Sequence, residues 1–176
     1  MLTLAAYVTD ENYSLLGEHY GEFRPDGSKD VVWGAEAEKV HGITYDVALS
    51  FPCIEEASEK FLEFAEAYPP LTFIAHNMAF DRRMVRGTLS KSDRHFRFYQ
   101  CFPRFQDTIK LVKESGLVSS KSKSLGAICK ELGIPHDHHD ARSDAKVLIE
   151  IHKRCSQVIS KENIMALSDG PITDAP

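Results

Sequence analysis

A short apolar segment leads directly into a capped helix in the middle of the chain. Residues 71–75 form an apolar run of strand length. Asn77 can cap a helix over residues 78–89, because its side-chain oxygen can accept a hydrogen bond from a backbone N–H of the first turn. A buried strand followed at once by a helix is typical of α/β proteins, which bind ligands at the carboxyl ends of their strands. Asp81, in the first turn, is expected to face that crevice.

Hydrophobic periodicity predicts most of the other helices and strands. The alternating segments 2–8 and 15–23 predict two strands that form a hairpin. Helices are predicted at residues 35–40, 54–68, 107–114, 124–132 and 141–158. Residues 90–104 have no sustained period, so we predict a loop there, with a strand near 104–106. One domain is expected over residues 1–160, followed by a loosely held tail over residues 161–176.

Charge limits how the chain can bind nucleic acid. The net charge is −5, which argues against binding by bulk attraction across the whole surface. Residues 81–104 are the exception, because they hold seven basic and two acidic residues. This basic segment is either a solvated helix face followed by a polar loop or a patch that faces phosphate groups.

Cysteines and hydropathy indicate a reduced, soluble protein. The four cysteines lie far apart in the sequence, without the spacing of a zinc site or a disulfide framework. No apolar run approaches the roughly 20 residues that span a bilayer. We therefore expect a cytoplasmic protein with no membrane partner.

A second group of polar residues lies around the start of the last predicted helix. His139 precedes this helix and Asp144 lies in its first turn, so both side chains can face one crevice. A solvated polar loop is the plain alternative, and acidic residues favour first turns for the helix dipole alone. The histidines of this segment also raise the possibility of zinc, but no cysteine or fourth histidine has suitable spacing.

Three motifs together resemble the DEDDh exonucleases, the group that includes the epsilon subunit of bacterial DNA polymerase III and ribonuclease T. The family motif H-N-x-x-F-D is matched by His76, Asn77, Phe80 and Asp81, and H-x-A-x-x-D is matched by His139, Ala141 and Asp144. The nucleotide-contacting H-G-I segment is matched by His41, Gly42 and Ile43. The order and spacing of these motifs agree over nearly the whole chain.

The resemblance implies a fold, a reaction and a set of site residues. The fold would be an α/β ribonuclease H-like domain with a mixed sheet flanked by helices. The activity would be 3′-to-5′ exonuclease hydrolysis with two Mg²⁺ or Mn²⁺ ions, held by Asp81 and Asp144, with His139 as the catalytic base. The substrate would be the 3′ end of single-stranded DNA or RNA, and a DNA polymerase would be a further partner. Substrate-binding residues would be His41, Gly42, Ile43, His76, Asn77 and Phe80.

One family motif has no counterpart in the chain. In the family, a first strand ends in Asp-x-Glu, and Met1 falls where the second strand begins. We therefore expect the central strand to be absent. Three explanations remain open: the native protein begins earlier; the chain is an inactive module that binds nucleic acid or a polymerase; or residues 163–169 take the vacant strand position.

Overall fold

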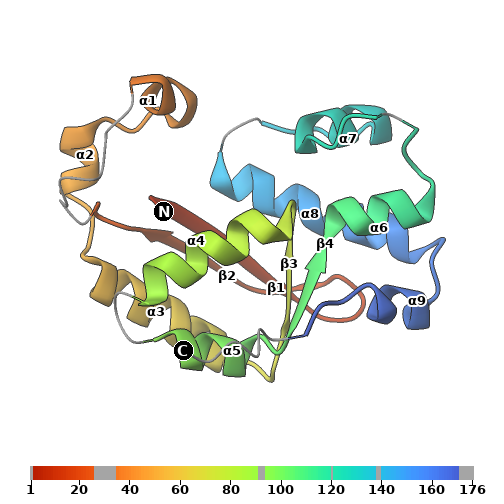
Figure 1. Cartoon of the computed structure of the whole chain (residues 1–176), viewed down its shortest axis with the longest axis horizontal. Helices are drawn as coiled ribbons and strands as arrows, with labels where there is room; N and C mark the ends of the chain where they lie inside the picture. The colour runs from red at the N-terminus through yellow and green to blue at the C-terminus, as the bar shows by residue number, and fades with distance from the viewer. Residues whose placement is uncertain (1, 26–34, 91–93, 120, 138–139, 171–176) are drawn as a thin grey trace.

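The computed structural model describes residues 2–25, 35–90, 94–119, 121–137 and 140–170 (Figure 1). Its helices are α1 (Ala35–His41), α2 (Tyr45–Leu49), α3 (Ile54–Glu66), α4 (Met78–Ser90), α5 (His95–Cys101), α6 (Thr108–Ser115), α7 (Leu125–Leu132), α8 (Ala141–Ser156) and α9 (Lys161–Ala166). Its strands are β1 (Thr3–Thr9), β2 (Leu15–Glu22), β3 (Thr72–Ala75) and β4 (Arg104–Asp107).

The four strands form two separate pairs. β1 and β2 are antiparallel and make the predicted hairpin, whereas β3 and β4 are parallel. Within the described residues, no backbone ladder joins the two pairs. α8 contacts both β1 and β3, so this helix connects the two pairs by side-chain packing.

Two hydrophobic clusters hold the elements together. The first is rich in aromatic rings from α3, α5 and β4, including Phe61, Phe98, Phe102 and Phe105. The second joins α6, α7, α8 and α9 through aliphatic side chains and two cysteines. Phe105 and Ile151 are fully buried at the centres of the first and second clusters, respectively.

The segment predicted as a loop contains a helix. Residues 95–101 form α5 because Phe98 and Cys101 are buried against α3 and α4, a partner surface that local periodicity does not reveal. Arg97 adds two ion pairs to α3, with Glu59 and Glu66. The predicted strand near residues 104–106 is confirmed as β4.

Residues 161–170 pack against the domain, which corrects two expectations for the end of the chain. Ile164 of α9 is only 7% exposed and belongs to the second cluster. Asp169 exchanges two backbone hydrogen bonds with Phe105, at 2.9 and 2.8 Å. β3 pairs with β4 along one edge, so Asp169 lies at the opposite edge of β4. Residues 163–169 therefore do not take the vacant strand position between β1 and β3, which corrects the third explanation given above. The expectation of a loosely held tail is therefore wrong for these ten residues.

Candidate active site

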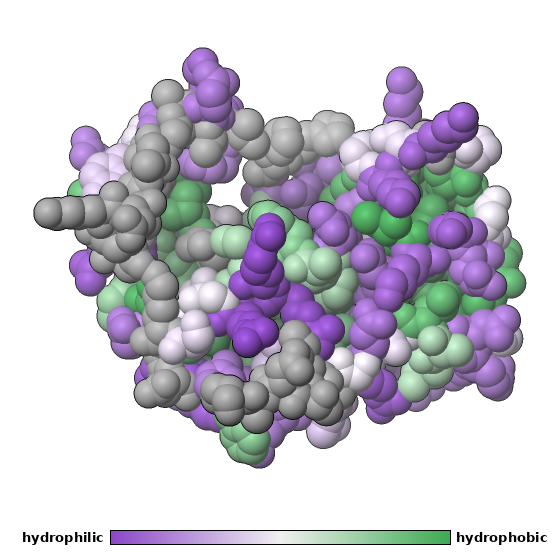
Figure 2. Space-filling model, in the orientation of Figure 1, coloured by the Kyte–Doolittle hydropathy of each residue, from purple (hydrophilic) through white to green (hydrophobic). Residues whose placement is uncertain are grey.

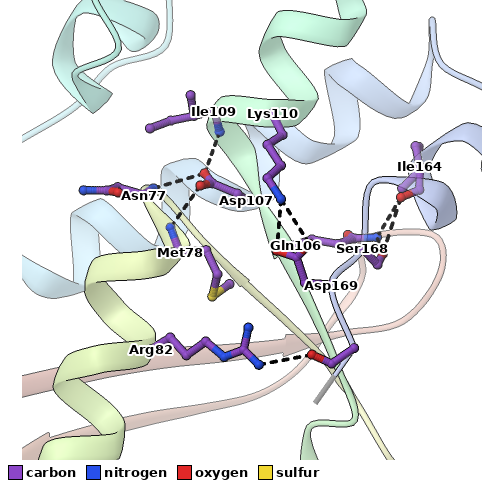
Figure 3. A network of polar contacts seen from close by, with 11 residues as sticks. Asn77, Met78, Arg82, Gln106, Asp107, Ile109, Lys110, Ile164, Ser168 and Asp169 are labelled. Atoms are coloured by element: carbon purple, nitrogen blue, oxygen red, sulfur yellow. Dashed lines mark hydrogen bonds and ion pairs between the residues drawn. The ribbon is translucent and has the colours of Figure 1, made fainter. Parts of the chain in front are cut away.

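Asp107 joins the carboxyl ends of β3 and β4 to the helices that follow them. Its carboxylate accepts hydrogen bonds from the backbone N–H groups of Asn77 at 3.1 Å, Met78 at 3.2 Å and Ile109 at 2.9 Å (Figure 3). These contacts satisfy donors that have no partner inside α4 or α6. One side chain therefore fixes both helix starts at the end of the parallel strand pair.

The start of α4 differs in detail from the sequence prediction. The Asn77 backbone has a φ of 62°, in the left-handed region that asparagine tolerates better than most residues. Its side chain makes no hydrogen bond to the described part of the chain; the Asp107 carboxylate takes the helix-start donors instead. Asn77 therefore shapes the turn and does not cap the helix.

Asp81 lies in the first turn of α4, as predicted. Burial raises the pKa of its carboxyl group from 3.8 to about 6, and the negative charge of Asp107 acts in the same direction. The carboxylate is therefore short of positive neighbours. A cation bound beside it would restore the charged form.

His76 lies just before the first turn of α4, and Phe80 lies within it. The two ring nitrogens of His76 are 2.9 Å from the Thr108 hydroxyl and 2.6 Å from the Lys123 carbonyl oxygen, so the imidazole is held in place. Phe80 is 49% exposed, with the Arg83 guanidinium 5.6 Å from its ring centroid. An exposed ring of this kind can stack against a nucleotide base.

Asp144 lies in the first turn of α8, which begins as predicted after Asp140. The Asp140 carboxylate caps the helix by accepting from the Ser143 N–H at 2.8 Å. Asp144 contacts the Nε2 atom of His136 at 2.5 Å. Both residues line a pocket of about 430 Å³ beside α7. His139, the predicted base, lies outside the described residues.

The H-G-I segment lies at the end of α1. Gly42 has a φ of 70°, and the His41 ring accepts a hydrogen bond from the Ile43 N–H at 3.0 Å. In Figure 1, α1 lies apart from α4 and α8. The helix that ends at His41 is therefore separated, in this view, from the helices that carry Asp81 and Asp144.

The two predicted metal ligands lie in different immediate surroundings. The first turns of α4 and α8 lie on the same side of the molecule in Figure 1, but Asp81 interacts with Asp107 and Asp144 with His136. Carboxylate oxygens suit Mg²⁺ and Mn²⁺. Within the described residues, however, no group of three or more histidine, cysteine or acidic side chains is arranged to hold a metal ion. The predicted pair alone therefore does not make a complete site.

Asp107 and His136 interact with the predicted metal ligands, but neither residue belongs to the matched family motifs. The helix predicted from residue 107 is confirmed as α6, and the Asp107 side chain caps it by accepting from the Ile109 N–H. Its bonds to Asn77 and Met78 join segments 29 and 30 residues apart, so no local signal reveals them. His136 precedes its helix like His139, and spacing alone does not show which histidine faces Asp144.

A family model described as an exonuclease matches residues 2–152. The chain belongs to this exonuclease family. It is 30% identical to a DNA polymerase III PolC-type protein of Thermotoga maritima over 135 residues, covering 76% of the chain but 9% of that protein. It is 26% identical over 145 residues to the DNA polymerase III subunit epsilon of Escherichia coli, covering 80% of the chain and 56% of the subunit.

Two solved structures show that the exonuclease fold extends over almost the whole chain. Exonuclease I matches with a TM-score of 0.74 and 17% identity, over 94% of this chain and 38% of that one. Exonuclease X in complex with 5′ overhanging duplex DNA matches with a TM-score of 0.61 and 17% identity, over 95% and 99%. The predicted α/β, ribonuclease H-like class is therefore confirmed. No helix in the described ranges has the length and apolar character needed to cross a bilayer.

Proposed function

We propose that this exonuclease-family chain removes nucleotides one at a time from the 3′ end of a single-stranded nucleic acid. The observation that carries the proposal is the partly buried Asp81, with its raised pKa, at the carboxyl end of the parallel strand pair, within a family match over residues 2–152. This edge is where α/β sheets bind ligands. Exonucleases of this family generally use divalent metal ions, and Mg²⁺ or Mn²⁺ fits the oxygen donors present.

The proposed chemistry assigns separate roles to three side chains. Asp81 and Asp144 would hold a pair of divalent ions, which supply an activated water and stabilise the leaving oxygen. His139 would accept the proton of the attacking water. Burial of Asp81 supports its role, because its carboxylate has little other compensation for its charge.

The terminal nucleotide would be bound by side chains around the same edge. Phe80 offers an exposed ring for stacking, while contacts from Thr108 and Lys123 orient His76. Stacking accepts every base, so weak sequence preference is expected. Asn77 is a further proposed contact at this edge, and His41, Gly42 and Ile43 are proposed contacts from the end of α1.

The relatives suggest where such an activity would be used. The similar proteins of Thermotoga maritima and Escherichia coli are named as DNA polymerase III components. We propose that this chain also works with a DNA polymerase, in the cytoplasm, and removes nucleotides during replication or repair. The chain spans a small part of the first of these relatives, so the partnership is a proposal for the family domain alone.

A gel assay on a 5′-labelled single strand tests the activity. Wild-type protein with Mn²⁺ should produce a ladder of stepwise shortened products, because the label remains on the end opposite to attack. Asp144→Asn should abolish the ladder, since the amide lacks the charge that holds a cation. The exposed neighbour Asp137 provides a matched Asp137→Asn control, which should retain activity.

Two results would contradict the proposal. Shortening that persists in Asp144→Asn would remove that residue from the chemistry. Binding of the labelled strand by wild-type protein without any shortening would instead assign a noncatalytic binding module, the alternative function for this chain.

A further inference from the structure

The basic segment at residues 81–104 divides into two parts in the structure. Arg94, which directly precedes α5, and Arg97 of α5 form ion pairs with Glu59 and Glu66 of α3, at 2.6 to 2.7 Å. These arginines stabilise the contact between two helices, which agrees with the plainer interpretation of a charge run. The arginines of α4 have different surroundings.

Three arginines of α4 line a pocket together with Lys110 of α6. The pocket has a volume of about 380 Å³, and its charged lining consists of Arg82, Arg83, Arg86, Lys110, Asp107 and Asp169. Four cations and two carboxylates leave a formal charge of +2 on a chain whose net charge is −5. Figure 2 shows strongly hydrophilic side chains gathered over α4, near the middle of the face in view.

The three arginines of this pocket have donors available for an anion. Arg83 and Arg86 are exposed, and neither forms an ion pair within the described part of the chain. The guanidinium of Arg82 is fixed 4.4 Å from the centroid of the Phe105 ring, and its Nη2 donates to the Gly170 carbonyl oxygen at 3.1 Å. Its Nε atom is buried and has no hydrogen-bond partner among the described residues.

An anionic group of the chain itself already occupies the edge of the pocket. Both carboxylate oxygens of Asp169 lie near the Lys110 ammonium, at 3.0 and 3.1 Å (Figure 3). The backbone bridge to Phe105 places this carboxylate there. The contact shows that the pocket geometry accepts an oxyanion beside the cations.

The pocket adjoins the proposed active site. Met78 and Asp107 line it, and the same Asp107 carboxylate accepts from the Asn77 and Met78 N–H groups at the start of α4. Asp81 lies in the first turn of that helix. A polyanion that reaches the active-site edge can therefore contact the pocket at the same time.

We propose that the arginine pocket binds backbone phosphate groups of the nucleic-acid substrate, in competition with the carboxylate of Asp169. The proposed function supplies the identity of the polyanion; the pocket adds a second point of attachment, away from the terminal nucleotide. Guanidinium groups suit this role because their planar donors match phosphate oxygens.

Fluorescence anisotropy measures the contribution of the pocket to binding. The probe is a 5′-fluorescein-labelled oligothymidylate of about 12 nucleotides, titrated in EDTA so that no hydrolysis occurs. The double variant Arg83→Gln/Arg86→Gln should bind about tenfold more weakly. The slope of log K against log salt should decrease by about 0.7 for each lost phosphate contact.

A control variant separates the pocket from general charge loss. Lys60→Gln/Lys153→Gln removes the same charge from exposed positions on α3 and α8, so its affinity should stay close to that of wild type. Asp169→Asn keeps the backbone bridge and removes the competing charge, so its affinity should increase about twofold to fivefold. Thermal unfolding of each variant checks that the fold is intact.

The outcomes separate this inference from the proposed function. Equal affinities of the arginine double variant and wild type overturn the pocket even if wild type shortens the strand. Weaker binding by the arginine double variant than by the lysine double variant supports the pocket even if no shortening occurs. Equal losses in the arginine and lysine double variants, or no binding by wild type, overturn the pocket. Weaker binding by Asp169→Asn overturns the competition.

Discussion

The two carboxylates proposed as metal ligands differ in their exposure and in their neighbours. Asp81 is partly buried, and its pKa is raised to about 6. Asp144 is 41% exposed at its side chain and contacts His136. Two carboxylates with the same proposed role therefore differ in exposure and in the groups beside them. Cation binding at neutral pH would shift the protonation of Asp81 more than that of a fully solvated acid.

His139→Ala tests whether His139 is the catalytic base and not a metal ligand. The variant should slow strand shortening by about 10² to 10⁴, because the attacking water loses its proton acceptor. Metal affinity, measured by calorimetry with Mn²⁺, should remain near that of wild type. His138→Ala, the neighbouring change, is the matched control for rate. A fall in metal affinity as large as that of Asp144→Asn would show that His139 is a ligand.

At the scale of elements, one carboxylate connects two strand ends with two helix starts. Asp107 ends β4, caps α6 and accepts from two backbone donors at the start of α4. Charged hydrogen bonds of this kind are stronger than neutral ones. The position of the α4 turn, which carries His76, Phe80 and Asp81, therefore depends on a residue of the adjacent strand.

Asp107→Asn should destabilise the protein by about 2 to 3 kcal/mol. The amide keeps the shape of the side chain, but it has one acceptor oxygen where the carboxylate has two. Some of the three backbone donors therefore lose their hydrogen-bond partner. Urea unfolding measures the change. Asp46, exposed in the first turn of α2, provides the control Asp46→Asn, which should stay within about 0.5 kcal/mol of wild type. Equal stability of Asp107→Asn and wild type would contradict this capping account.

At the scale of the whole molecule, His152 connects parts of the fold that lie far apart in the sequence. Its ring nitrogens are 2.9 Å from the Tyr13 hydroxyl, in the β1–β2 connection, and 2.9 Å from the Gln106 side-chain oxygen of β4. The two strand pairs share no ladder in the described residues. This contact through α8 is therefore one of the links that hold them together.

Acid should weaken the protein through His152. Burial lowers the pKa of this imidazole below its usual value of 6.5, so the folded state disfavours the protonated ring. Stability should therefore be lost as the pH falls through the unfolded-state pKa of 6.5. Urea unfolding between about pH 7.5 and pH 5 should show a smaller loss for His152→Gln than for wild type. Parallel pH profiles for the two proteins would refute this assignment.

The sequence by itself determined the elements whose signals are local. The apolar run at residues 71–75 and the helix start expected after Asn77 predicted β3 and α4, and the helices predicted from residues 107, 124 and 141 correspond to α6, α7 and α8. The first-turn positions of Asp81 and Asp144 followed from these starts. Motif order over the whole chain predicted the exonuclease family, which the family match confirmed.

Tertiary structure decided the features that depend on partners distant in sequence. α5 forms where Phe98 meets the aromatic cluster, and residues 161–170 are held by Ile164 and by the bridge to β4. Glutamates of α3 form ion pairs with Arg94 and Arg97, while the arginines of α4 line a pocket. Such pairings depend on burial and charge across separate elements, and local periodicity carries no information about either.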